Sequence, residues 1–396
     1  MFLALSVAFK GSYGFSGALI ISSYGWLFSR QIRRNIKLTF TEKGLVVVLL
    51  GYLCSVILEV VFYQLPLREI DAEGKILLLL PLVFILNAVQ IHFLVTLLGI
   101  AAGALGLFVL AAYETYFLGL DRSGTFINAI QLGNIAMAFS FIAMLLSPII
   151  FKINNKGTLL GTLMILAGLL GFYASLSTLT RGGLLFAPIL LTIVGLYNVR
   201  SLKKHYKMFV LALSLGCVSA FTLLPDSGII SRFSVAFENY ENYFNKGNAS
   251  SSTGIRLEMW KAAAIISFDN PLLGIGAIEY ETQKNQLIES GIINASIGYY
   301  DHPHNAYLYA TARRGLIGLV FFLALLFYPI YIAHREIRQN NSTCSLNSPA
   351  MALLIFGLFF VFANITQVLF AHNSGMIMYT GLLILLVSLM VSMRKA

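Results

Sequence analysis

"HFLVTLLGIAAGALGLFVLAAYETYF", from His92 to Phe117, contains one formally charged residue, Glu114. A helix of about 20 apolar residues crosses the roughly 30 Å hydrocarbon core of a lipid bilayer. The stretch therefore predicts a membrane-spanning helix. Comparable bands of about 17 to 25 apolar residues recur along most of the chain.

The whole composition points the same way. The 396 residues are 58% hydrophobic and 11% charged, with a mean hydropathy of +0.81. A soluble domain carries about 25% charged residues, so that class is excluded, and a membrane β-barrel would show short alternating segments instead. We expect an all-α polytopic membrane protein with about 12 transmembrane helices, or about 11 if the first two form one span. The expected spans are residues 2–13, 14–29, 44–63, 74–90, 92–117, 133–151, 158–177, 182–199, 207–224, 305–333, 349–370 and 374–393.

Basic residues concentrate in alternate loops. These loops hold 15 of the 27 basic residues, with Glu42 and Glu336 as their only acids. The positive-inside rule places them in the cytoplasm. The formal charge of +10 thus reflects topology and contact with membrane lipid, and we expect no nucleic-acid partner. The residues are Arg30, Arg33, Arg34, Lys37, Lys43, Lys152, Lys156, Arg200, Lys203, Lys204, Lys207, Arg335, Arg338, Arg394 and Lys395.

One long connection divides the chain on the opposite side. We expect an N-terminal transmembrane bundle over residues 1–224, a loop domain over 225–304 and C-terminal transmembrane helices over 305–396. Connections longer than about 15 residues are usually functional or disordered. Apolar residues repeat at helical spacing over residues 231–244 and 254–268, which predicts amphipathic helices lying on the membrane.

Arginines mark this outer side. Arg181 follows "STLT" and precedes two glycines that open a helix, where free N–H groups and a guanidinium fork together suit phosphate. A snorkelling interfacial arginine is the alternative. Arg256 and Arg122 are further candidates, although each has an acid nearby, Glu258 and Asp121 respectively, with which it could simply pair.

The segment "DHPHNAYLYATARRGLIG", residues 301–318, places histidines at the mouth of a span. Pro303 restricts His302 to extended backbone, and Asn305 is a suitable helix N-cap. His304 is then a candidate general base at the outer interface, or else a hydrogen-bonded interfacial histidine. No further histidine or cysteine lies nearby in sequence, so we expect no metal site.

The same segment continues into the span with two further polar features. Arg313 and Arg314 fall inside the membrane and must face protein, water or an anionic ligand. Gly315 and Gly318 would allow close helix packing.

These residues resemble the O-antigen ligases and related Wzy-type polymerases. "HNAYLYATARRGLIG" fits their pattern H-[N/S/Q]-x9-G-x-x-[G/T/Y], and "RLEMW" followed by "NPLLGIG" is similar to their R-x3-W helix and turn. "STLTRGG" resembles their [S/T]-R-G segment. "RSGTFINAIQLGN" matches their G-x-F-x-N-P-N stretch more weakly, with Ala129 in place of proline.

The resemblance implies a GT-C-type glycosyltransferase in the bacterial inner membrane, with its active site facing the periplasm. Such enzymes pass a glycan from undecaprenyl diphosphate to an acceptor hydroxyl, on lipid A–core for a ligase, without metal or other cofactor. It implies His304 as the catalytic histidine and Arg181, Arg256 and Arg122 as diphosphate-binding residues. Asn305, His302 and Arg314 are supporting candidates.

Glycan transfer from a lipid diphosphate requires residues of these types. Negative charge develops on the departing diphosphate, and fixed arginines can stabilise it. A base on the far side of the sugar activates the hydroxyl and inverts the configuration. We expect Asn305 or a loop acid to orient that base.

Three alternatives stay open. The polymerase uses the same donor, and a third family type transfers glycan to a protein hydroxyl. The ligase is favoured because the [S/T]-R-G segment and the full histidine motif occur together. A lipid-linked glycan flippase would place polar residues near the bilayer midplane, whereas here Glu59 and Glu114 are the main lone carboxylates in spans, both toward an outer end.

Overall fold

The computed structural model describes residues 18, 20–89, 91–125, 128–151, 157–201, 229–339 and 347–395. Every regular element in these ranges is helical, which confirms the all-α class. The expected spans 2–13 and 207–224 lie outside the described residues. The predicted number of spans therefore stays a prediction.

Six helices within the described ranges are long and apolar enough to cross a membrane. They are α4 (Phe40–Phe62), α7 (Phe93–Ala112) with the π-turn η3 (Tyr113–Phe117), α8 (Ala129–Ile150), α9 (Gly157–Ser177), α15 (Ala306–Gln339) and α17 (Asn373–Lys395). Shorter apolar helical segments are α5 (Lys75–Leu79) with α6 (Pro81–Ala88), part of α10 (Arg181–Ser201), and α16 (Ser348–Ala363). The chain is thus a multi-pass membrane protein.

The remaining helices are short or lie outside the bundle. They are η1 (Tyr24–Phe28), α3 (Arg30–Asn35), η2 (Leu67–Ile70), α12 (Ile229–Lys246), α13 (Ser252–Asp269), α14 (Gly276–Glu289), η5 (Ala295–Ile297) and η6 (Leu369–Ala371). The two helices expected within residues 231–244 and 254–268 correspond to α12 and α13.

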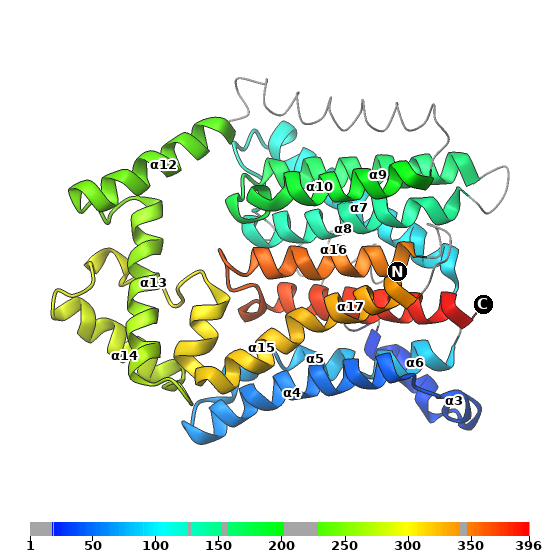
Figure 1. Cartoon of the computed structure of the whole chain (residues 1–396), viewed down its shortest axis with the longest axis horizontal. Coiled ribbons are helices and arrows are strands. Elements are labelled where there is room, and N and C mark those ends of the chain that lie inside the picture. Colours follow the sequence, from blue (N-terminus) through cyan, green and yellow to red (C-terminus); the bar gives the residue numbers. More distant parts are fainter. Residues whose placement is uncertain are drawn as a thin grey trace.

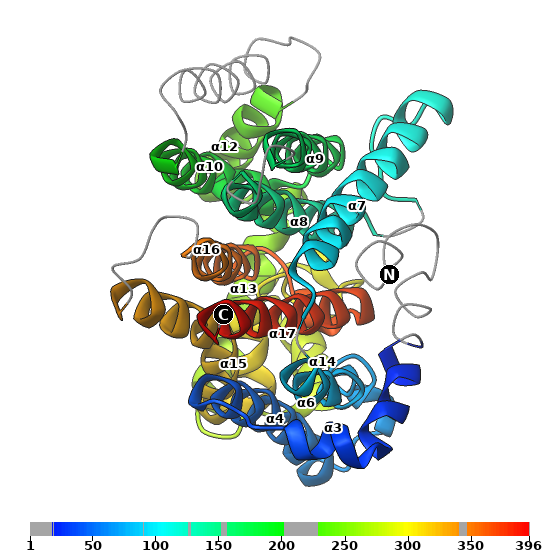
Figure 2. The ribbon, with the colours of Figure 1, turned by 90° about the vertical axis from the view of Figure 1, so that its right-hand side faces the viewer.

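The long helices run side by side (Figure 1). Viewed along the bundle, α16 and α17 lie between a group formed by α8, α9 and α10 and a group formed by α4 and α15 (Figure 2). Every residue of α8 from Gln131 to Ile150 is buried. α8 is therefore a central helix of the bundle rather than a lipid-facing one.

The two ends of the bundle differ. One end, which we call the loop end, carries α12, α13, α14 and the start of α15 (Figure 1). The other, the basic end, carries α3 with Arg30, Arg33 and Arg34, and the last turns of α15 and α17. The long-loop helices and the basic residues of α3 and of the ends of α15 and α17 thus lie at opposite ends of the bundle, as the charge pattern predicts.

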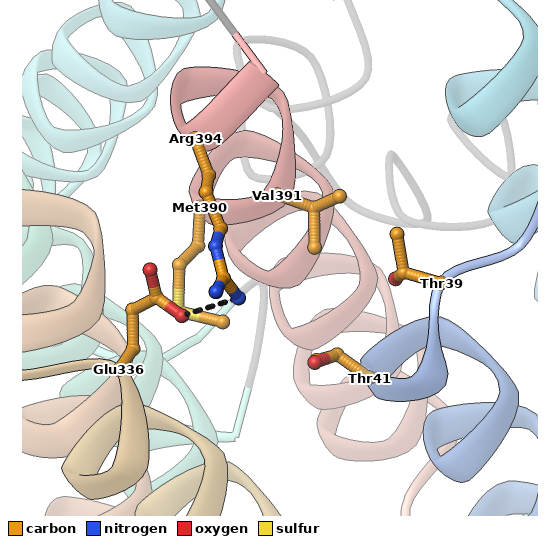
Figure 3. A pocket seen from close by; sticks show the side chains of 6 residues that line it. All are labelled: Thr39, Thr41, Glu336, Met390, Val391 and Arg394. Carbon is orange, nitrogen blue, oxygen red and sulfur yellow. Dashed lines mark hydrogen bonds and ion pairs between the residues drawn. The ribbon is translucent and has the colours of Figure 1, made fainter. Parts of the chain in front are cut away.

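A pocket of about 190 Å³ opens at the basic end (Figure 3). Across it Arg394 Nη1 lies 3.4 Å from Glu336 Oε2. Glu336 is roughly 45 Å along α15 from the start of that helix, at about 1.5 Å per residue. The pocket is therefore remote from the histidine motif. It is lined by Thr39, Thr41, Glu336, Met390, Val391 and Arg394.

At the loop end, α15 is broken at Gly315, which has φ 62° and ψ −163°. The turn after α13 fills the break: the Leu316 N–H donates to Pro271 O at 2.7 Å, and the Ile275 N–H to Ala312 O at 3.0 Å. A β-carbon on Gly315 would overlap the Leu272 carbonyl. Gly315 thus leaves room for the backbone of this turn, whereas from the sequence we expected it to allow close packing of another helix. Backbone groups freed by a helix break inside a membrane need such partners.

Gly315→Ala is expected to lower the free energy of unfolding by about 1–3 kcal/mol, because alanine is strained at positive φ and its methyl group meets the turn. Thermal unfolding in detergent measures the loss. Gly195→Ala is the matched control on α10, where a β-carbon meets no atom within 4 Å. Equal melting temperatures for the two variants would contradict the role of the kink.

Candidate active site

His304 lies in the short segment that leads into α15. Asn305 Oδ1 accepts the N–H groups of Tyr307 at 3.0 Å and Leu308 at 3.1 Å, so Asn305 is the predicted N-cap. His304 itself has φ 50°, a left-handed conformation that side-chain-bearing residues seldom adopt. Its N–H donates to His302 Nδ1 at 3.3 Å. Strained backbone of this kind persists only where its surroundings hold it.

Two loop helices hold this segment. Trp260 Nε1 on α13 donates to Pro303 O at 3.0 Å. The buried Lys284 on α14 donates to Tyr300 O at 2.6 Å, and its ammonium also pairs with Glu281 at 2.6 Å. The long loop therefore fixes the backbone on both sides of His302.

α13 also brings Arg256 to the site, because Arg256 lies one turn before Trp260. Burial lowers the pKa of the His304 imidazole, and the nearby Arg256 guanidinium lowers that pKa further, although Gln367 opposes them. His304 is consequently neutral, and able to accept a proton, at pH 7. Neighbouring Glu258 accepts from Tyr243 Oη at 2.5 Å and from the Asn294 N–H at 2.8 Å, and so ties α12 to α13.

Gln367 is a site residue that the sequence did not reveal. It follows α16, is 2% exposed, and its Oε1 is hydrogen-bonded to His304 Nδ1. The expected orienting group was Asn305 or a loop acid. In the structure Gln367 holds that position, whereas Asn305 caps α15. Gln367 is a polar residue in the connection between two apolar helices, and this feature of the sequence could have marked it as a candidate.

Two further histidines complete the cluster. The His302 ring centroid lies 4.5 Å from that of His304 and 6.0 Å from that of His372. Burial and the neighbouring imidazoles lower the pKa of His302 to about 3, and burial lowers the pKa of His372 as well. Among the described residues, no group of three or more His, Cys, Asp or Glu side chains is arranged to hold a metal ion.

The other two predicted arginine segments meet each other at the loop end. Arg122 Nε donates to Thr178 O at 2.6 Å, and the Ser123 N–H donates to Ser177 O at 3.2 Å. Arg181 is the first residue of α10, so a helix does begin where the glycine pair predicted. The side chain of Arg181 lies outside the described part of the structure.

Glu114, expected to be a lone carboxylate, binds the loop that carries Arg122. It accepts the N–H of Gly124 at 2.5 Å and that of Thr125 at 2.9 Å. The carboxylate thus fixes this loop beside the segment that leads to α10.

Arg313 and Arg314 face protein. Arg313 Nε lies 2.6 Å from Glu59 Oε1, and its Nη2 lies 3.2 Å from Glu69 Oε2. Arg314, predicted to support the site, lies 3.7 Å from Glu59 Oε2 and stacks over the Tyr52 ring.

This network reaches the histidines through one aromatic side chain. Arg313 Nη1 donates to Tyr309 Oη at 2.8 Å. The centroid of the Tyr309 ring lies 6.1 Å from that of His302. Tyr309 therefore lies between the buried ion pairs and the histidine cluster and is close to both.

Arg313→Met is expected to destabilise the protein by about 3–5 kcal/mol, because it removes the nearer cation from the buried Glu59 carboxylate, which then keeps only Arg314 at 3.7 Å. Arg68→Met is the matched control, since Arg68 approaches the same Glu69 at 3.8 Å but is 83% exposed. That change should cost less than about 1 kcal/mol. Chemical unfolding in detergent compares them, and similar losses would refute the buried network.

Residues 166–323 match the family model described as O-antigen ligase, a range that includes Arg181, Arg256 and His304. An uncharacterised protein of Haemophilus influenzae is 24% identical over 383 residues, covering 96% of this chain and 93% of its own length. The O-antigen ligase of Escherichia coli K12 is 26% identical over 220 residues, covering 54% of this chain and 49% of its own length. The family-model match and the Escherichia coli relative support the O-antigen ligase family, which the motifs predicted.

Proposed function

We propose that this protein is an O-antigen ligase that transfers a glycan from undecaprenyl diphosphate to a hydroxyl of lipid A–core oligosaccharide. The reaction takes place at the periplasmic face of the bacterial inner membrane, which corresponds to the loop end. The observation that carries the proposal is the placement of His304, which is hydrogen-bonded to Gln367, held by the long loop and close to Arg256, in surroundings that lower its pKa. The family match supports the same reading.

His304 acts as the general base. It takes the proton of the acceptor hydroxyl while that oxygen attacks the anomeric carbon of the donor glycan. The bond from that carbon to the diphosphate oxygen breaks on the opposite face, so the configuration inverts. The proton then leaves His304 for solvent, and undecaprenyl diphosphate departs with the electron pair of the broken bond.

Arginines stabilise the departing diphosphate. Arg256 on α13, Arg181 at the start of α10 and Arg122 beside Thr178 belong to segments at the loop end. Fixed cations that are positioned before the reaction stabilise charge that develops only in the transition state. We therefore propose a reaction without metal or other cofactor, in which the donor's lipid tail stays in the membrane.

The contacts weigh against transport. A flippase would place polar residues near the bilayer midplane, and Glu59 and Glu114 were the main carboxylates in spans that the sequence suggested had no partner. Glu59 is paired with Arg313 and Arg314, and Glu114 accepts loop N–H groups. Two related types of enzyme, the polymerase that extends a lipid-linked glycan and the transferase that modifies a protein, use the same lipid-linked donor. They are separated from the ligase by the acceptor that the protein uses.

His304→Ala should reduce glycan transfer by about 10²–10⁴-fold, the usual contribution of a positioned general base. Purified protein, lipid-linked donor and lipid A–core are mixed, and the glycosylated core is quantified on gels. His334→Ala is the matched control, because His334 is exposed and lies near the basic end of α15. Near-normal transfer by His304→Ala would contradict the assignment of His304 as the general base.

Arg256→Gln should shift the acid limb of the kcat/KM profile to higher pH. Removing the cation raises the pKa of His304, so the base is protonated, and activity is lost, at a higher pH than before. The plateau should also fall about 100-fold as the leaving group loses a fixed charge. Lys261→Gln changes an exposed cation on the same helix and should leave the limb in place. An unmoved limb in Arg256→Gln would contradict the coupling.

A further inference from the structure

The turn between α16 and η6 carries Gln367 to the active site. The Ala306 N–H donates to Asn364 O at 2.9 Å, so the first turn of α15 is bonded directly to this turn. The Asn364 N–H in turn donates to Phe360 O at 3.2 Å. His304 and Gln367 therefore lie on two segments whose relative position is set by the backbone.

The carboxamide contact has a chemical consequence. An amide oxygen only accepts hydrogen bonds, so Gln367 Oε1 requires a hydrogen on His304 Nδ1. In a neutral imidazole the other nitrogen, Nε2, then carries the free lone pair. Gln367 thereby selects which ring nitrogen can accept a proton.

The His304 backbone is held independently. His302 Nδ1 accepts the His304 N–H, and it can do so only while it is unprotonated. Burial of His302 keeps that ring neutral. The titratable or charged groups around His304 come from several elements and are Arg256, Tyr300, His302 and His372.

We propose that Gln367 is a positioning residue that fixes the tautomer and orientation of His304, so that Nε2 takes the proton of the acceptor hydroxyl. This inference rests on the proposed function of His304. A neutral amide orients the ring without the electrostatic stabilisation of imidazolium that a carboxylate would add. The base therefore stays unprotonated over a wide pH range.

Nitrogen-15 NMR of histidine-labelled protein tests the tautomer without any activity measurement. The His304 signals are identified by their loss in His304→Ala. We expect a protonated Nδ1 and an unprotonated Nε2 above the titration of the ring. The opposite tautomer would overturn the inference. If no acceptor is glycosylated by the wild type, the proposed function fails, whereas the tautomer still reports on Gln367.

Kinetics give the second test. Gln367→Glu places a carboxylate beside His304 and should move the acid limb of kcat/KM upward by about 1 pH unit. Gln367→Leu should lower kcat about 100-fold through misplacement of the base, with little change in the donor KM. Gln283→Glu makes the same chemical change on α14 and should leave the profile unchanged. An unchanged limb in Gln367→Glu, with the variant folded, would overturn the inference.

Discussion

The pairing of Arg313 with Glu59 is the interaction on which the loop end depends. A charge inside a membrane must be neutralised by a partner, and this pair, with Arg313 Nε 2.6 Å from Glu59 Oε1, joins α15 to α4. Two residues further along, α15 breaks at Gly315. The turn that follows α13 packs into this break and is hydrogen-bonded to its backbone. α13 then holds Pro303 through Trp260. One continuous series of contacts thus leads from a buried ion pair to the backbone beside His304.

The site is assembled from segments that are far apart in the chain. α13 supplies Arg256, the entry to α15 supplies His304, and the turn after α16 supplies Gln367. Burial is the common physical theme. It lowers the pKa of all three histidines and makes an unpaired polar group beside them costly. The proposed base, His304, therefore needs no proton removed before it can act.

Local patterns predicted what depends on local physics. Apolar length predicted helices such as α7 and α8, and Asn305 was identified as an N-cap because capping involves only the next turn. The contact of His304 with Gln367 spans 63 residues, and that of Arg313 with Glu59 spans 254. No sequence period encodes such pairs, so Gln367 was missed and Glu59 was taken for a lone carboxylate. The positive φ at Gly315 was likewise invisible, because a glycine pair in a span equally suggests helix packing.

The most direct measurement of the central claim compares the products formed from the lipid-linked donor with and without lipid A–core. Purified protein is incubated under both conditions, and the glycans are resolved by mass spectrometry. A ligase produces glycosylated core only when core is supplied and leaves the donor chain length unchanged. Longer glycans on undecaprenyl diphosphate in the absence of core would contradict the ligase assignment and identify a polymerase instead.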